Sequence, residues 1–244
     1  MALQYSALCK GCWQQMHMPI PLRGGFSMPF RVVGIRPSKM NPNICTICEM
    51  MFSRMMKART VMIEATIMFA DLRGYTKLSQ SLPAGDVAGL LDDFYDRCAA
   101  AIWEHDGLLN KTIGDAVLAI FNFPIKRDDH SRQAVLAARQ LQQSFADQRA
   151  RLDGALAADG DEFGIGVGIH TGEVSFGEFG HSHRDLTAIG TVVNMAARAQ
   201  SAAQPGQILV TKEVRDQAQA ELQGSTASDY ALKGFDRPVA LYAA

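Results

Sequence analysis

The sequence of 244 residues has neither a long apolar run nor a strong excess of one charge. No stretch approaches about 18 consecutive apolar residues, so no membrane segment is predicted. The N-terminus lacks the charged, apolar and small-residue regions of a signal peptide, and we therefore expect a cytoplasmic protein. With a formal net charge of -1 the chain is not basic enough to wrap nucleic acid, and we expect no nucleic-acid partner. The rest of the composition, 48% hydrophobic and 20% charged, is that of an ordinary globular protein.

Cysteine is scarce over most of the chain, but four of the five cysteines lie near the N-terminus. Cys9, Cys12, Cys45 and Cys48 form two Cys-x-x-Cys pairs, whereas Cys98 stands alone in an apolar helical pattern that predicts a core position. In a reducing compartment, paired Cys-x-x-Cys motifs indicate a metal site before structural disulfides.

The N-terminal quarter also differs from the rest in its other residues. Five of the nine prolines lie within residues 1–44, which are predicted to form loops and short strands, and 11 of the 12 methionines lie at or before Met68. Apolar residues at helical spacing predict a short helix over about 43–58. We therefore expect a cysteine-rich module with its connecting helix at 1–58, followed by a second domain at 59–244.

The second domain alternates between strand and helix patterns. Strands are predicted over 61–70, 108–112, 116–121, 163–169, 173–179, 208–211, 230–232 and 239–242. Helices are predicted from Thr76 to about Leu82, over 84–105, from Asp128 onwards, over 191–202 and up to about Leu222, with a loop over 155–161. We expect 108–112 with 116–121, and 163–169 with 173–179, to form hairpins. This mixture indicates an α+β fold with helices on one face of a largely antiparallel sheet.

Two aspartates lie where an apolar strand pattern breaks at a glycine. Asp71 stands in Phe69-Ala-Asp-Leu-Arg-Gly-Tyr-Thr76, and Asp115 in Lys111-Thr-Ile-Gly-Asp-Ala-Val117. Carboxylates held at strand ends could share a pair of divalent cations. The turn at 74–76 leads into a helix start, where unpaired N–H groups can bind a phosphate chain. An ordinary turn after each strand is the simpler alternative, but the two motifs together indicate chemistry on a nucleotide.

A third motif, Thr187-Ala-Ile-Gly-Thr-Val-Val-Asn-Met-Ala-Ala-Arg198, carries two polar side chains four residues apart. On a helix Asn194 and Arg198 project from one face, so their donors could reach a single anionic centre. The alternative is a solvated surface pair. The flanking residues are small and apolar, which favours a functional role.

These motifs together resemble the catalytic domain of class III nucleotidyl cyclases. The resemblance covers about residues 61–243, with every segment in the family's order. It implies a ferredoxin-like α+β fold. The segments that carry it are Phe69-Ala-Asp-Leu-Arg-Gly-Tyr-Thr76, Lys111-Thr-Ile-Gly-Asp-Ala-Val117, Gly168-Ile-His-Thr-Gly172, Gly190-Thr-Val-Val-Asn-Met-Ala-Ala-Arg198 and Leu232-Lys-Gly-Phe-Asp-Arg-Pro-Val239.

The resemblance implies a metal-binding half of the site. Asp71 and Asp115 would hold two Mg²⁺ or Mn²⁺ ions, with the Leu72 carbonyl completing one coordination sphere. The residues expected to meet the phosphates are Gly74, Tyr75 and Thr76.

It also implies a second half that comes from another subunit. Asn194 would orient the ribose, Arg198 would stabilise charge on the α-phosphate, and Lys233 would bind the triphosphate. In the family the two halves meet between two subunits. The resemblance therefore implies a homodimer with shared sites.

Base choice depends on Lys111 and Thr187 in the resembling family. Lysine at the first position and Asp or Thr at the second read adenine, whereas guanine readers carry Glu and Cys. The chain departs from the common pattern at Thr187, Leu186 and Ile189. We predict an adenylate cyclase that converts ATP to 3′,5′-cyclic AMP and pyrophosphate. A guanylate cyclase and a non-catalytic nucleotide-binding sensor remain the alternatives.

The N-terminal cysteines allow three kinds of site. The two pairs are separated by 32 residues, more than the roughly 15 to 20 of a zinc ribbon, yet four thiolates can still close a tetrahedral Zn²⁺ site. The same four could hold an iron–sulfur cluster or act as redox dithiols, and His17 could replace one ligand. Because the second pair begins the helix before the first catalytic strand, we hypothesise that this site regulates activity.

Overall fold

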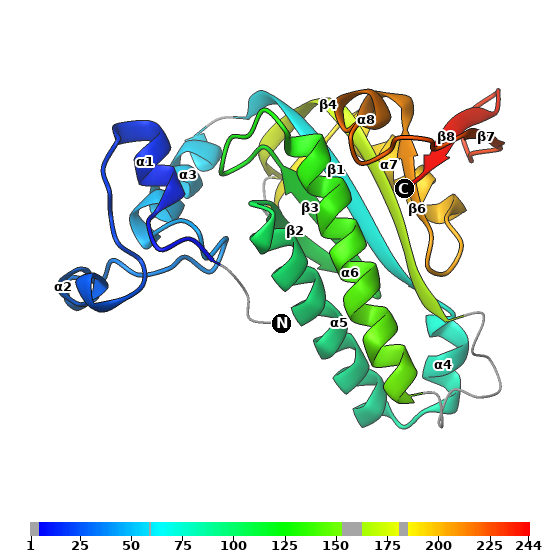
Figure 1. The fold of residues 1–244 in the computed structure, drawn as a ribbon, viewed down its shortest axis with the longest axis horizontal. Helices are drawn as coiled ribbons and strands as arrows, with labels where there is room; N and C mark the ends of the chain where they lie inside the picture. Colours follow the sequence, from blue (N-terminus) through cyan, green and yellow to red (C-terminus); the bar gives the residue numbers. More distant parts are fainter. Residues whose placement is uncertain (1–4, 59, 153–162, 181–184) are drawn as a thin grey trace.

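The computed structural model describes residues 5–58, 60–152, 163–180 and 185–244. Its centre is an eight-stranded sheet in the order β2-β3-β1-β4-β6-β8-β7, with β5 paired to β4 (Figure 1). The strands are β1 (Val61–Arg73), β2 (Leu108–Ile113), β3 (Ala116–Phe121), β4 (Gly164–Phe179), β5 (Asp185–Ile189), β6 (Ile208–Thr211), β7 (Ala227–Tyr230) and β8 (Val239–Ala243). The helices are α1 (Lys10–Met16), α2 (Met28–Val32), α3 (Thr46–Ala58), α4 (Tyr75–Ser81), α5 (Ala84–Glu104), α6 (His130–Leu152), α7 (Thr191–Ala202) and α8 (Lys212–Gln217). Only β4 and β6 pair in parallel among these strands, so the sheet is largely antiparallel, as predicted.

Two long strands, β1 and β4, form the middle of the sheet and correct two predictions. They pair without interruption from Val61 opposite Phe176 to Arg73 opposite Gly164. The first strand therefore continues past Asp71 instead of ending before it. The predicted hairpin of 163–169 with 173–179 is wrong, because β4 is one strand and its glycines do not mark a turn.

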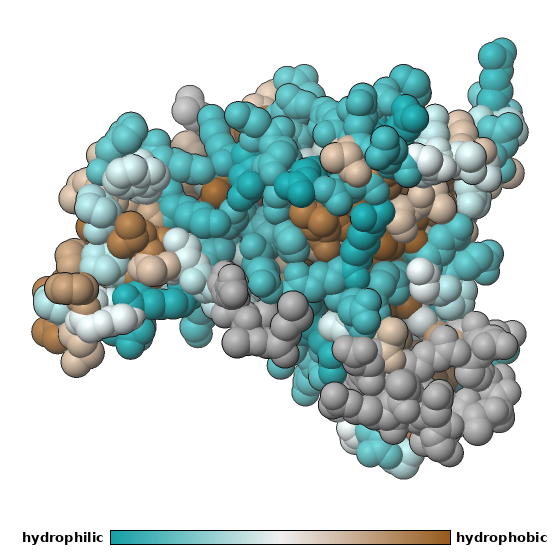
Figure 2. All heavy atoms as spheres, viewed as in Figure 1, coloured by the Kyte–Doolittle hydropathy of each residue, from teal (hydrophilic) through white to brown (hydrophobic). Residues whose placement is uncertain are grey.

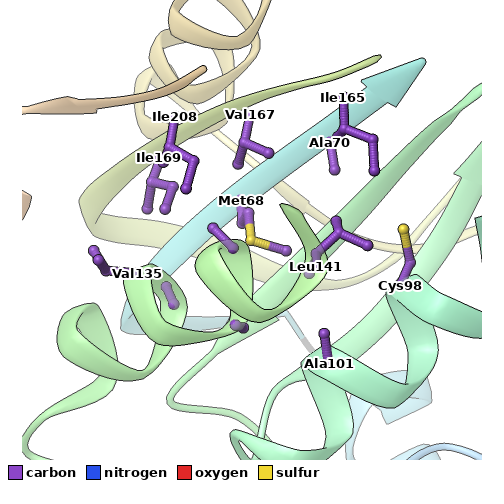
Figure 3. Packing of buried hydrophobic residues seen from close by; sticks show 14 of the residues in the cluster. Met68, Ala70, Cys98, Ala101, Val135, Leu141, Ile165, Val167, Ile169 and Ile208 are labelled. Carbon is purple, nitrogen blue, oxygen red and sulfur yellow. The ribbon is translucent and has the colours of Figure 1, made fainter. Parts of the chain in front are cut away.

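One face of the sheet is covered by α5 and α6. Side chains alternate along β1, so Met68, Ala70 and Leu72 point to this face and pack against apolar residues of both helices. Figure 3 shows Cys98 of α5 among them. Cys98 is fully buried, as the sequence predicted for a core residue.

The other face is covered by α7 and by the N-terminal segment, so the expectation that helices lie on one face is wrong. Ala65 and Ile67 of β1 share a core there with Val192 and Ala196 of α7. The close approach of α7 requires Gly168 of β4, because a Cβ at this position would overlap the backbone of Ala196 and Gln200. The segment 168–172, which was predicted to hold a hairpin turn, therefore makes room for helix α7 instead.

Residues 5–45 correct the prediction of loops and short strands. They contain α1, a 3₁₀ turn (Gly25–Ser27) and α2, with isolated bridges from Leu8 to Pro21 and from Pro37 to Cys45 in place of strands. The helix predicted over 43–58 is α3.

The N-terminal segment packs directly on the sheet through aromatic side chains. Phe52 of α3 lies 5.3 Å from Phe123, which lies 4.7 Å from Phe176 of β4, measured between ring centroids. We propose a domain boundary at residue 58, across which both parts share one core.

Smaller differences concern the ends of three helices and one strand that was not predicted. Gly74, not Thr76, is the N-cap of α4. Helix α6 begins at His130 instead of Asp128, α8 ends at Gln217, and β5 was not predicted. The loop predicted over 155–161 lies outside the described residues. None of the described helices meets the length and apolarity needed to cross a membrane.

Candidate functional site

The two predicted metal carboxylates lie close together, Asp71 near the end of β1 and Asp115 in the turn between β2 and β3. Asp71 of β1 is the register partner of Ala116, the residue after Asp115, and the Leu72 N–H donates to the Asp115 carbonyl at 3.1 Å. Burial raises the pKa of Asp71, and the negative charge of Asp115 raises it further. Two hard oxygen donors that repel each other fit Mg²⁺ or Mn²⁺, since a divalent cation between them would remove this repulsion.

Two residues that the sequence analysis did not single out hold Asp71. The Gln200 Nε2 of α7 donates to the Asp71 carboxylate at 2.9 Å, and Arg73 lies 3.7 Å from the same oxygen. Arg73 also donates to the Gln200 carbonyl. Arg73 could have been found from its position within the aspartate motif. Gln200 could not, because it stands 129 residues from Asp71 in the sequence.

The turn after β1 has the shape predicted for a phosphate-binding turn. Gly74 has a φ of 76°, and α4 starts directly after it with no side-chain cap. Thr76 is exposed, whereas the Tyr75 side chain packs against the apolar cluster under α5. The backbone N–H groups at this turn are therefore the groups that could meet a phosphate.

The two predicted base-reading residues are brought together by Asn110, which the sequence analysis also missed. The Thr187 hydroxyl donates to the Asn110 Oδ1 at 3.1 Å, and the Asn110 Nδ2 donates to the Leu186 carbonyl at 2.8 Å. Lys111 forms an ion pair with Asp185. A β-bulge between Leu109 and Lys111 interrupts the β2–β3 ladder at Asn110.

The remaining predicted residues line a separate hollow of about 520 Å³ between α7 and the loop before β8. Asn194 and Arg198 lie on one face of α7, as the spacing predicted, and Lys233 faces them across the hollow. His170 also lines it, donating or accepting at 2.7 Å with the Thr211 hydroxyl, and burial lowers the His170 pKa. The lining comprises His170, Thr191, Asn194, Met195, Arg198, Lys233, Gly234 and Phe235.

Within the described residues, the predicted site residues of one chain therefore form two separate groups. Asp71 lies near the end of β1 and Asp115 in the neighbouring turn between β2 and β3, and neither lines the hollow of Asn194 and Arg198. The two groups are separated by α7 itself, because Gln200 projects from the side of the helix that meets Asp71.

The four N-terminal cysteines converge on one point. Their sulfur atoms all lie within 4.8 Å of one another and are buried. Cys12 lies 3.5 Å from Cys45 and 3.4 Å from Cys48, and Cys9 lies 3.7 Å from Cys48, measured between sulfurs. His17 is exposed and lies against Trp13, so it is not among these ligands.

Local backbone features support this cysteine cluster, Cys9, Cys12, Cys45 and Cys48. The N–H groups of Cys12 and Cys45 donate to the Cys9 sulfur at 3.4 Å and 3.2 Å. Gly11 is required between the first two cysteines, because a Cβ at this position would lie 2.9 Å from the Cys48 sulfur. Hydrogen bonds from Cys48 and Cys9 lower the pKa of Cys45, whereas burial raises the pKa of Cys12 and the hydrogen bond with Cys45 raises the pKa of Cys48.

A buried carboxylate links the cysteine cluster to the sheet. Asp106, in the turn between α5 and β2, is 2% exposed and accepts from Lys10 at 2.6 Å. Arg127 donates to it at 2.9 Å and Asn43 at 3.0 Å. Lys10 stands next to Cys9 in the sequence, so this contact connects the cysteine cluster to the turn before β2, the strand that carries Lys111.

Comparisons with known proteins support a nucleotide site. The family model described as "Adenylate and Guanylate cyclase catalytic domain" matches residues 57–243. The chain is 35% identical over 139 residues to the adenylate cyclase of Anabaena cylindrica, covering 55% of this chain and 26% of that protein. It is 34% identical over 180 residues to an uncharacterised protein of Mycobacterium tuberculosis, covering 72% of this chain and 31% of that protein. The chain therefore spans less than a third of the length of these curated relatives.

Solved structures give the same family. The adenylyl cyclase CyaB from P. aeruginosa superimposes with a TM-score of 0.67 at 29% identity, covering 76% of this chain and 95% of that one. The guanylyl cyclase Cya2 gives a TM-score of 0.67 at 25% identity, covering 75% and 92%.

Proposed function

The chain belongs to the adenylate and guanylate cyclase catalytic domain family, and from this membership we propose that it is an adenylate cyclase working as a homodimer. Its fold is that of class III nucleotide cyclases. The proposed reaction converts ATP to 3′,5′-cyclic AMP and pyrophosphate, in the cytoplasm.

The observation that carries the shared-site proposal is the division of the predicted residues within one chain. Asp71 and Asp115 carry negative charge at the end of β1, while Arg198 and Lys233 carry positive charge in a separate hollow. A triphosphate with its metal ions needs both sets at once. Two chains related by a two-fold axis would bring each set against the other and form two equal sites.

In the proposed mechanism the ribose 3′-oxygen attacks the α-phosphorus in line, the 3′-proton leaves to solvent, and the bond to the β-phosphate oxygen breaks. Asn194 orients the ribose, and Arg198 takes up charge on the α-phosphate as the transition state forms. Lys233 holds the triphosphate against rotation. Two Mg²⁺ or Mn²⁺ ions held by Asp71, Asp115 and the Leu72 carbonyl would make the hydroxyl more acidic and neutralise the leaving pyrophosphate.

The hydrogen bonds around Thr187 support adenine as the base. The Asn110 amide has a fixed orientation, because its Nδ2 donates to the Leu186 carbonyl. The Thr187 proton is directed to the Asn110 Oδ1, which leaves the hydroxyl lone pairs to accept from an amino group. Adenine presents a 6-amino group there, whereas guanine presents a carbonyl that needs a donor. Lys111 would donate to the adenine N1.

The proposed function is tested by mixing two inactive variants. Purified protein with Mn²⁺ is expected to form cyclic AMP from ATP in preference to cyclic GMP from GTP. Asp71→Asn and Arg198→Ala should each lower the rate at least about 100-fold. When the two are refolded together, half of the dimers carry one intact site, so about a quarter of the wild-type activity should return. The Asp71→Asn/Arg198→Ala double variant is the control that stays inactive. Mixed dimers without recovered activity would refute the shared site.

We propose Zn²⁺ as the ion of the cysteine cluster. In a tetrahedron with Zn–S bonds of about 2.3 Å the sulfurs lie about 3.8 Å apart. Three of the six sulfur pairs here lie 3.4 to 3.7 Å apart, and all six lie within 4.8 Å. An iron–sulfur cluster has several atoms between its ligands and would hold the sulfurs further apart. We expect one zinc per chain and no visible absorption in freshly purified, anaerobic protein. Iron with inorganic sulfide would overturn this assignment.

We propose that this ion influences catalysis through two connections. Helix α3 begins at the second cysteine pair and leads into β1, which carries Asp71. Lys10 beside Cys9 holds Asp106 at the start of β2, which carries Lys111. Cys45→Ser should therefore lower cyclase activity. Zinc-free protein with the wild-type rate would show that the ion serves folding alone.

A further inference from the structure

Charge is divided unevenly along the chain. The first 48 residues contain five of the 24 Lys and Arg residues and none of the 25 Asp and Glu residues. The near-neutral total therefore combines a basic N-terminal segment with an acidic catalytic part. A basic segment is attracted to anionic surfaces, over a distance of about one Debye length.

The same segment exposes large apolar side chains at its outer end. Phe26 is 88% exposed, Val32 84%, Val33 71% and Met28 62%. These four residues, here named the apolar tip, lie on and beside α2, at the end of the molecule farthest from β7 and β8 (Figure 1). Figure 2 shows apolar side chains gathered at this end. Exposed apolar side chains grouped in this way mark an interaction surface.

The apolar tip is held in a defined shape. The Ser27 N–H donates to the Gly24 carbonyl, and the Ile35 N–H donates to the Phe30 carbonyl at 2.8 Å, which closes the segment on both sides. The Thr46 hydroxyl, at the start of α3, donates to the Gly34 carbonyl at 2.9 Å. The tip is therefore fastened to the helix that carries Cys48, and little conformational entropy would be lost on binding.

A hollow of about 640 Å³ is lined by Arg36, Pro37 and Lys39, in the segment that follows the apolar tip. Arg36 and Lys39 line it together with Thr46, which also anchors Gly34. The one acidic residue in its lining, Glu49, accepts from the Ser38 hydroxyl at 2.7 Å. Two cations beside a hydroxyl group suit a phosphate with a negative charge.

We propose that the apolar tip and this hollow dock the protein on an anionic phospholipid bilayer. The tip side chains enter the acyl-chain boundary, while Arg31, Arg36 and Lys39 meet the headgroup phosphates. The convex tip spans about ten residues, fewer than the 20 to 30 per partner that a stable protein interface uses, which disfavours a second copy as the occupant. Docking of this kind would place the cyclisation of ATP at a membrane surface.

The test uses the full chain and vesicles of phosphatidylcholine, with or without one-third phosphatidylglycerol. Sedimentation should recover at least tenfold more protein with anionic vesicles than with neutral ones, and 0.5 M NaCl should reduce the difference. Phe26→Ser/Val32→Ser should lose at least tenfold in partitioning. Met62→Ser, which removes a 59% exposed apolar side chain from β1, is the matched control and should bind as the wild type does.

A second readout separates docking from misfolding. In Phe26→Trp, tryptophan emission should shift to the blue only when anionic vesicles are added. Zinc content and cyclase activity without vesicles should remain at the wild-type level in all tip variants. Equal partitioning of wild type and Phe26→Ser/Val32→Ser would overturn the proposal. So would a lower oligomeric mass in the tip variant, since the tip would then be a protein interface.

Discussion

Replacing Asp106 with asparagine is expected to loosen the contact between the cysteine cluster and the sheet. The Asp106 carboxylate is 2% exposed, and both of its oxygens lie 2.6 Å from the Lys10 ammonium. Arg127 and Asn43 complete its hydrogen bonds. Asparagine has the same size and tolerates the positive φ of 61° at this position. The loss is therefore mainly electrostatic, because an amide would present a donor to one of two cations.

The magnitude follows from the burial of the partners. Breaking a fully buried ion pair costs about 3–5 kcal/mol, since an unpaired charge stays out of water. Here the carboxylate is buried, but Lys10 and Arg127 are each 34% exposed and can regain water. We therefore expect Asp106→Asn to lower the free energy of unfolding by about 2–3 kcal/mol. In the Asp106→Asn background, Lys10→Met should cost at least about 1 kcal/mol less than in the wild type.

Urea unfolding followed by circular dichroism measures this loss. With a slope of about 3 kcal/mol per molar urea, the midpoint should fall by about 0.7–1 M. Asp93→Asn is the matched control, because Asp93 pairs with Arg97 within α5 and is 38% exposed, so its loss should cost about 0.5 kcal/mol. An Asp106→Asn midpoint no lower than that of Asp93→Asn would refute the role of the buried carboxylate.

Four further outcomes are expected. Gln200→Leu removes the donor to Asp71 and should raise the Mn²⁺ concentration for half-maximal rate about tenfold. An unchanged concentration would show that Gln200 serves packing alone. Burial lowers the pKa of His130, so the unfolded chain binds a proton first, and stability should fall as pH drops from about 6.5 towards the folded pKa. His130→Gln should flatten this loss in melting temperatures measured between pH 7.5 and 5. Removing the cysteine-bound metal should lower the melting temperature by more than about 5 °C, and an unchanged value would contradict a structural ion. Lys111→Glu/Thr187→Cys should raise the ratio of GTP to ATP turnover at least tenfold, and an unchanged ratio would contradict base reading by this pair.

Local sequence patterns predicted some elements with their observed bounds. Helix α7 and strand β6 have the predicted bounds, because apolar periodicity and flanking glycines or prolines define them within a few residues. Strand β4 was predicted wrongly since Gly168 and Gly172 look like turn residues. At Gly168 the glycine makes room for the backbone of α7, which lies about 30 residues further along the chain. A single sequence does not distinguish these two uses of glycine.

The same limit applies to the site. Short motifs drew attention to Asp71 and Asp115, which the structure brings close together, and a spacing of four places Asn194 and Arg198 on one helix face. The residues that orient them, such as Asn110 and Gln200, were missed, since each acts on a residue more than 70 positions away. The link from Lys10 to Asp106 spans 96 residues and depends on the fold of an N-terminal segment with no sustained period.

In the proposed dimer, helix α7 of each chain would contact both sites. One side of this helix presents Asn194 and Arg198 to the hollow, and the other presents Gln200 to Asp71. In a two-fold dimer Asp71 of a chain would serve one site and its Arg198 the other, so each α7 contacts both sites. Asp71 would hold a metal ion in the proposed site, and its hydrogen bond from Gln200 would then join that ion to the helix that carries Asn194 and Arg198. Coupling between two sites needs a physical element that both of them contact, and in the proposed dimer α7 would be that element.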